Sequence, residues 1–144
     1  MASPTTLKLV VSSDVRLVDL IHNAAEKVAQ LAGFDADDAL NIGLAVREGA
    51  INAIIHGNGS NKKLEVNVTL SANGDGFSAH ITDEGEGFDP QGAPDPTQGK
   101  GLLKTSGRGL LLMRAFVDEV VYSRRGARGM EVTMTKKKTD NRDD

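Results

Sequence analysis

Residues Asn41–Asn58, with the sequence NIGLAVREGAINAIIHGN, form the stretch that decides the fold. Apolar residues recur here at intervals of three and four, which is the spacing of a helix with one buried face. Glu48, Asn52 and His56 are four residues apart, so they lie above one another on one side of that helix. A buried carboxylate or amide is costly without partners. The stretch therefore predicts a helix that carries a polar binding site. A solvated helix edge is the alternative interpretation of Glu48 and Asn52.

The flanking sequence predicts further strands and helices of one domain. Strict alternation of apolar and polar residues indicates strands with one solvated face, and glycine or asparagine clusters separate them. The predicted elements are an edge strand at Thr5–Ser12, a helix at about Val15–Ala32 capped by Ser13 or Asp14, the long helix from Asp35 to Gly57, a hairpin of Leu64–Leu70 and Phe77–Thr82, a helix that opens at Ser106–Leu110, and strands at Val117–Ser123 and Gly129–Thr135.

Length and composition limit the classes of protein to consider. A chain of 144 residues with a formal net charge of −3 fits one domain and does not fit a protein built mainly to grip nucleic acid. It has no cysteine, so neither a disulfide framework nor a thiolate metal site is expected. No apolar run approaches the length of a membrane span, and we expect a cytoplasmic protein. The domain is predicted to cover residues 1–136, followed by a disordered charged tail at 137–144.

Two glycine-rich segments lie where the predicted strands and helices end. Asp83 ends a strand and begins the motif DEGEGF, in which glycines two apart indicate a tight backbone path beside a ligand. The polar stretch from Gly85 to Gly107 is long for a loop in a compact domain and is predicted to be a lid. Gly107 and Gly109 are predicted to open a helix whose N-terminus receives an anion.

These motifs, in this order, resemble those of the Bergerat-fold ATPases. The shared features are a helix with E-x-x-x-N, a strand end with D-x-G-x-G-F, a long polar loop and G-x-G before a helix. Within that superfamily the chain resembles the small anti-sigma factor serine/threonine kinases of bacterial stress and sporulation control, in EGAINAIIHGN and GRGLLLMRAFVDEV. The resemblance covers about Leu7 to Thr135. The expected fold is α+β, a two-layer α/β sandwich with three helices on a mixed, mainly antiparallel sheet.

The resemblance implies a role for each matching residue. Glu48 would be the general base for a substrate hydroxyl. Asn52 would bind Mg²⁺, and Asp83 would accept a hydrogen bond from the amino group of the adenine of ATP. The other implied ATP-binding residues are Gly85, Gly87, Phe88, Thr105, Ser106, Gly107, Arg108, Gly109 and Leu110. The family's arginine before S-G is Thr105 here, so Arg108, Lys104 and Lys100 remain alternatives for the cation that contacts phosphate.

The resemblance also implies partner proteins. A small anti-anti-sigma protein would be phosphorylated, a sigma factor would be sequestered, and Arg16 would lie on the partner-binding surface. The chain would form a homodimer through its sheet side. No direct contact with nucleic acid or membrane is expected. Two other functions stay open from the residues: a non-catalytic ATP-binding switch, and a detached histidine-kinase-like ATPase domain. His56 is interpreted as a helix cap rather than a catalyst, and Asp83 could instead only close a hairpin.

Overall fold

The computed structural model describes residues 4–85 and 101–138, without the side chains of residues 101–108. One five-stranded sheet has the strand order β1-β2-β3-β5-β4. Its strands are β1 (Thr5–Ser12), β2 (Glu65–Asn73), β3 (Gly76–Thr82), β4 (Glu119–Arg124) and β5 (Met130–Lys137). All four ladders between these described strands are antiparallel, so the predicted mixed sheet is corrected to an antiparallel one. The edge strand Thr5–Ser12 is confirmed.

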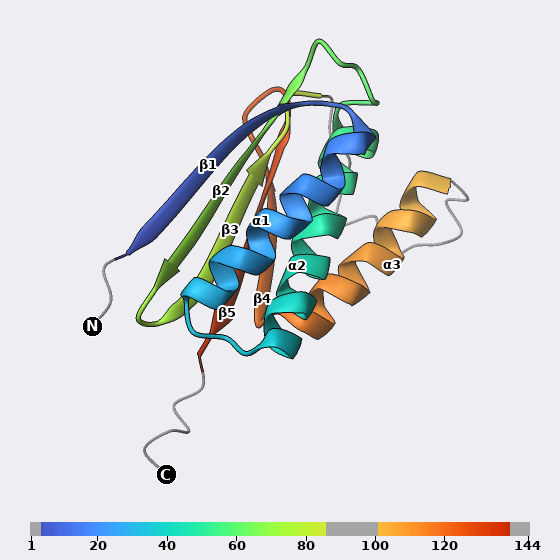
Figure 1. Ribbon diagram of the computed structural model, residues 1–144. Helices are drawn as coiled ribbons and strands as arrows, with labels where there is room; N and C mark the ends of the chain where they lie inside the picture. Colours follow the sequence, from blue (N-terminus) through green and yellow to red (C-terminus); the bar gives the residue numbers. More distant parts are fainter. Residues whose placement is uncertain (1–3, 86–100, 139–144) are drawn as a thin grey trace.

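Three α-helices lie side by side on one face of the sheet (Figure 1). They are α1 (Val18–Leu31), α2 (Ala36–Ile51) and α3 (Gly101–Phe116). A short 3₁₀ helix, η1 (Val15–Leu17), precedes α1, and the Asp14 carboxylate caps it by accepting a hydrogen bond from the Arg16 backbone N–H. Asp35 caps α2 in the same way through the Asp38 N–H. The two-layer α+β sandwich expected from the sequence is therefore confirmed.

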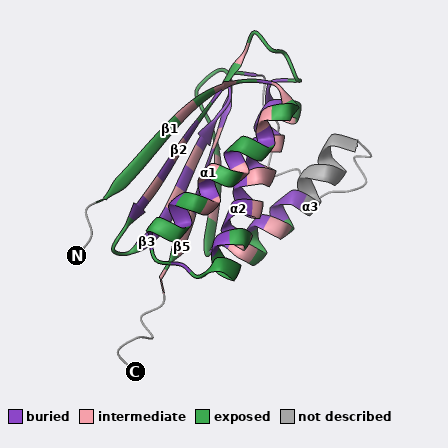
Figure 2. Ribbon diagram, in the orientation of Figure 1, coloured by how far each residue is buried: buried purple, intermediate pink, exposed green. Residues whose placement is uncertain are grey.

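The core fills the space between the sheet and the helices, and it is almost entirely aliphatic. Buried positions line the inward faces of α1 and α2, whereas β1 is largely exposed (Figure 2). In β2 the side chains alternate between the core and the outer face of the sheet: Val66, Val68 and Leu70 are fully buried, while the residues between them face outward. The long helix α2 is held in the middle of the helical layer, between α1 and α3. Polar residues on α2 can therefore be buried as well.

Two predicted boundaries are wrong. The third helix begins at Gly101 rather than at Ser106–Leu110, so Gly107 and Gly109 lie inside α3 and not at its N-terminus. Leucine and lysine at 102–104 have good helix propensity, and a helix tolerates interior glycines at a cost of about 1 kcal/mol each. The strand β5 continues to Lys137, because Lys136 and Lys137 pair with Phe77 and Gly76 of β3. Residues 139–144 of the predicted tail lie outside the described residues.

Candidate functional site

The central helix changes its geometry where its functional residues stand. α2 ends at Ile51 and is continued by a π-helical turn, η2 (Asn52–Gly57). The Asn58 N–H accordingly donates to the Ala53 carbonyl, five residues back, at 2.8 Å. π-helical turns are rare and often mark functional sites. The sequence periodicity did not reveal this widening, which begins at Asn52.

Asn52 is 1 % exposed, so the solvated-edge interpretation is wrong for this residue. Its Nδ2 donates to the hydroxyl of Tyr122 on β4 at 3.0 Å. Its Oδ1 is buried and has no hydrogen-bond partner among the described residues. A buried amide oxygen without a partner costs about 1–3 kcal/mol, which a cation or a donor on a ligand would offset.

Tyr122 is a site residue that sequence analysis missed. Burial raises the pKa of its hydroxyl to about 12, and the nearby carboxylates of Asp83 and Glu48 act in the same direction. The hydroxyl therefore stays neutral at physiological pH and can hold the Asn52 amide in one orientation. It is the only tyrosine in the chain, but 70 residues separate it from Asn52, and no local pattern joins them.

Glu48 lies one turn before Asn52 and is half-buried between α2 and α3. Gly109 of α3 passes closely over both residues. A Cβ at position 109 would lie 3.1 Å from Glu48 Oε1 and 3.7 Å from Asn52 Nδ2. Gly109, predicted to receive phosphate at a helix N-terminus, thus lies instead at a close crossing of α3 with α2.

Asp83 is 3 % exposed and lies immediately after β3. Its Oδ1 accepts hydrogen bonds from the backbone N–H groups of Met130, at 3.1 Å, and Gly85, at 3.2 Å. Burial raises the pKa of the Asp83 carboxyl above its ordinary value, against the effect of these two bonds and of the Arg125 cation. The carboxylate is thus held in a fixed orientation by the backbone, as a group that recognises a ligand would need to be.

The end of the central helix packs directly against the Asp83 segment. A Cβ on Gly57 would collide with the Asp83 carboxylate, and one on Gly85 would collide with the Gly57 carbonyl. The glycine at 85, expected to give a ligand close access, is therefore already required by the protein's own packing. Asn58 completes this contact, because its Oδ1 accepts from the Glu84 N–H at 2.8 Å and its Nδ2 donates to Ser13 Oγ at 2.8 Å.

Two cavities border these residues. A small one of about 10 Å³ is lined by nine residues, among them Asn52, Asp83 and Tyr122. It has room for about one water molecule, far less than a purine ring. A larger groove of about 350 Å³ runs along His56, Gly57, Asn58, Gly59, Leu64, Gly85 and Arg128. A nucleotide base that reached Asp83 from this groove would have to widen the small cavity.

His56 lines the larger groove, and its Nε2 is buried without a hydrogen-bond partner in the described residues. Burial lowers the pKa of its imidazole. A neutral imidazole has little interaction with the helix dipole, so the interpretation of His56 as a charged helix cap is not supported.

Several predicted site residues are only partly visible or lie elsewhere. Gly87 and Phe88 lie outside the described residues. Thr105, Ser106, Gly107 and Arg108 are in α3, but their side chains are not described. Leu110 is 7 % exposed and belongs to the hydrophobic core.

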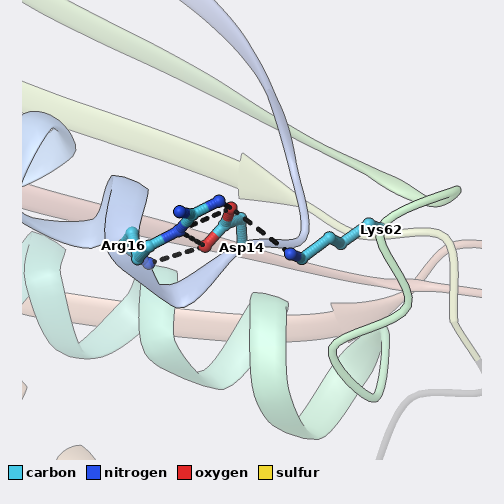
Figure 3. Close-up of polar contacts among 3 residues, drawn as sticks. All are labelled: Asp14, Arg16 and Lys62. Atoms are coloured by element: carbon cyan, nitrogen blue, oxygen red, sulfur yellow. Dashed lines mark hydrogen bonds and ion pairs between the residues drawn. The ribbon is translucent and has the colours of Figure 1, made fainter.

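Arg16, the predicted partner-binding residue, lies in η1, at the same end of the helical layer as η2, and its side chain is 79 % exposed. Its guanidinium donates to both oxygens of Asp14, with the shortest bond at 2.6 Å, and Lys62 approaches the same carboxylate at 3.8 Å (Figure 3). The bond from Arg16 holds the pKa of Asp14 well below its usual range. The result is an exposed cationic pair around one carboxylate at the start of η1.

A divalent cation fits this site through Asn52. Among the described residues no group of three or more acidic or histidine side chains could hold a metal. Mg²⁺ commonly takes one or two protein oxygens and completes its shell with water and phosphate. The Oδ1 of Asn52, to which no described residue donates a hydrogen bond, matches that requirement. No helix within residues 4–85 and 101–138 combines the length and apolarity needed to span a bilayer.

Comparison with known families agrees with this fold. The model of the histidine kinase-like ATPase domain matches residues 11–136, so the chain belongs to that family. The predicted relationship to the anti-sigma factor kinases of the Bergerat-fold superfamily is confirmed.

The particular relatives are serine-protein kinases. The chain is 28 % identical to the serine-protein kinase RsbW of Bacillus subtilis over 136 residues, covering 90 % of this chain and 84 % of the relative. It is 30 % identical to RsbW of Bacillus licheniformis over 125 residues, covering 83 % and 77 %. The crystal structure of the RsbU and RsbW domains of Rv1364c from Mycobacterium tuberculosis superposes with a TM-score of 0.61 at 19 % identity. That match covers 92 % of this chain but only 32 % of the longer one, and it supports the fold alone.

Proposed function

We propose that this chain is a Mg²⁺- and ATP-dependent protein kinase that phosphorylates a serine or threonine of a small anti-anti-sigma protein and sequesters a sigma factor. The observation that carries the proposal is the buried Oδ1 of Asn52, which has no hydrogen-bond partner in the described part of the chain and lies one helical turn from the carboxylate of Glu48. Similarity to RsbW serine-protein kinases supports the class of reaction.

In the proposed reaction, Glu48 accepts the proton of the substrate hydroxyl while that oxygen attacks the γ-phosphorus of ATP. The bond from the γ-phosphorus to the bridging oxygen breaks, and ADP leaves with the electron pair. Mg²⁺ bound through Asn52 would offset the negative charge of the phosphates. Tyr122 keeps the Asn52 oxygen directed into the site, and Gly109 lets α3 approach Glu48 closely. Catalysis on this scheme depends mainly on positioning and charge.

Asp83 is assigned to the adenine. An ionised carboxylate accepts a hydrogen bond from the exocyclic amino group of adenine, whereas guanine presents an oxygen at the corresponding position. The two backbone N–H donors already fix Oδ1, so Oδ2, on the side of Gly57, is the oxygen left for a ligand. The predicted contacts from Gly87, Phe88 and residues 105–108 remain part of the proposal.

Arg16 and its neighbours are assigned to the protein partners. The exposed cations Arg16 and Lys62 share one carboxylate, so a partner carboxylate could replace or join Asp14. No element of the described residues covers the sheet face opposite the helices, which favours a homodimer through that face (Figure 1). Because ATP and sigma factors are located in the cytoplasm, we assign the activity to that compartment.

The test is transfer of labelled γ-phosphate from ATP to a cognate partner. Acid-stable phosphate on the partner is expected. Glu48→Gln should lower the transfer rate by about 10²–10⁴-fold with little change in ATP affinity. Asn52→Ala should lose the Mg²⁺-dependent part of ATP binding. Glu119→Gln, at an exposed carboxylate on β4, is the matched control and should behave as wild type.

Two results would contradict the proposed kinase, and a third would contradict the role of Glu48. ATP binding without transfer to any partner would favour the non-catalytic switch. Acid-labile phosphate on the product would favour the histidine-kinase-like reaction. Equal transfer by Glu48→Gln and wild type would remove Glu48 from the role of base.

A further inference from the structure

The turn between β4 and β5 touches the Asp83 segment at several points. Residues 124–129 include three arginines and two glycines. Gly126 and Gly129 have φ of 67° and 87°, values that favour glycine. The Arg125 N–H donates to the Gly129 carbonyl at 3.0 Å, which closes the turn. This geometry brings the Arg125 side chain back over the end of β3.

Arg125 binds the backbone of the very residue assigned to adenine. Its Nη1 donates to the Asp83 carbonyl oxygen at 2.7 Å. The same turn provides the Gly129 N–H, which donates to the Gly85 carbonyl at 2.6 Å, and the Met130 N–H, which donates to Asp83 Oδ1. A Cβ at Gly129 would collide with the Asp83 carbonyl, so the approach is close.

The Asp83 segment is therefore held from two sides. On one side, Gly57 contacts the carboxylate and Asn58 accepts from the Glu84 N–H. On the other side, the β4–β5 turn binds the backbone on both sides of the carboxylate through Arg125 and Gly129. The contact from Arg125 is a charge-assisted hydrogen bond to a backbone carbonyl, which is stronger than a neutral one.

We infer that Arg125 is a positioning residue of the nucleotide site, which fixes the Asp83–Gly85 backbone so that the Asp83 carboxylate meets the adenine amino group. The identity of the ligand in this inference rests on the proposed function, whereas the hydrogen bond from Arg125 to the Asp83 carbonyl is part of the structure. The Arg125 cation also opposes the rise in the Asp83 pKa that burial causes, so it helps keep the acceptor ionised.

The neighbouring arginine provides a matched control. Arg124 lies in the same turn region and is exposed, and its side chain forms no hydrogen bond or ion pair within the described part of the chain. Arg124→Gln removes the same charge from nearly the same place without touching Asp83. Arg125→Lys keeps a cation that can still donate to the Asp83 carbonyl.

The first measurement is amide hydrogen exchange of Gly85 and Met130 in the nucleotide-free full chain. Arg125→Gln should speed exchange at both amides, whereas Arg124→Gln should not, and Arg125→Lys should restore much of the protection. The second measurement is kinase kinetics. Arg125→Gln should raise the KM for ATP about tenfold with kcat nearly unchanged, and should narrow the preference for ATP over GTP.

Equal exchange and equal KM in Arg125→Gln and Arg124→Gln would overturn the inference. A fall in kcat with an unchanged KM would also overturn it, because that would place Arg125 with the reacting groups. If Arg125→Gln exchanged faster but the wild-type protein bound no ATP, the contact between Arg125 and Asp83 would be supported and the proposed function would be overturned instead.

Discussion

Asn52 and Asp83 are both buried and line the same small cavity, but their hydrogen bonds differ. Asp83 Oδ1 has two backbone donors, whereas Asn52 Oδ1 has no partner among the described residues. A polar oxygen that folding leaves unsatisfied destabilises the free protein and is kept where binding requires it. On the proposed function, Asp83 would be the fixed acceptor for the base and Asn52 the acceptor for the cation.

Asp83 should also affect stability in a way that depends on pH. Burial raises its folded-state pKa above the ordinary value of 3.8. Between these two pKa values the folded state binds more protons than the unfolded state, so the free energy of unfolding falls as pH rises through that window. Asp83→Asn removes this loss. We expect a higher Tm than wild type at pH 7, with the difference shrinking as the pH approaches 3.8.

The same substitution should weaken ATP binding by more than about tenfold, because the amide presents an N–H₂ donor toward the adenine amino group. Thermal melts at pH 4 and 7 and calorimetric ATP titrations measure the two effects. Asp75→Asn, in the exposed turn before β3, is the control and should show neither effect. A variant that is less stable than wild type at pH 7, but not at pH 4, would contradict the assigned direction of the pKa shift.

At the scale of elements, the junction of η2 with the Asp83 segment is the most constrained contact of the site. Gly57 and Gly85 pack backbone against backbone, and the bulk of a single methyl group cannot be accommodated there. Gly59, two residues beyond Gly57, has open space around its Cα hydrogen but a φ of 61°. The two glycines at the helix end therefore serve different physical needs, close approach in one case and backbone conformation in the other.

This difference predicts that two alanine substitutions affect ATP affinity differently. Gly57→Ala should cost about 2–3 kcal/mol of unfolding free energy and abolish most ATP affinity, because the new Cβ displaces the Asp83 carboxylate. Gly59→Ala should cost about 1 kcal/mol from the left-handed backbone, with ATP affinity retained. Urea denaturation and ATP titration separate the two effects. Comparable ATP affinity in Gly57→Ala and Gly59→Ala would show that the helix end does not position Asp83.

Sequence patterns predict the elements well where buried and exposed positions recur at a regular spacing along the chain. The three- and four-residue spacing in 41–58 gives α2, and strict alternation gives β2. The same patterns predict the start of α3 at Ser106–Leu110 instead of Gly101, because glycines at 107 and 109 are typical of a helix start. They also miss features that depend on contacts between elements, such as the π-helical turn at Asn52. For the same reason Tyr122 and Arg125 could not be found: each meets its partner across 70 or 42 residues of chain.

On the scale of the whole molecule, the site lies where four parts of the chain meet. α2 and η2 provide Glu48 and Asn52, the end of β3 provides Asp83, α3 provides Gly109, and the β4–β5 hairpin provides Tyr122 and Arg125. A ligand that contacts all four parts stabilises their relative arrangement, and therefore the fold. Binding should thus be detectable as thermal stabilisation without any partner protein.

At an ATP concentration 100 times Kd, linkage predicts about 2.7 kcal/mol of stabilisation. For a domain of this size that corresponds to a rise in Tm of roughly 5–10 °C. The rise should require Mg²⁺ in large part and should be smaller with GTP, because Asp83 accepts from an amino group that guanine lacks at that position. Asn52→Ala should lose the part that depends on Mg²⁺, whereas Asn23→Ala, an exposed amide on α1, should keep it. An equal shift with ATP and GTP would mean that Asp83 does not recognise the base. If neither nucleotide shifted the Tm, the Asn52 oxygen, which lacks a partner among the described residues, would need another ligand.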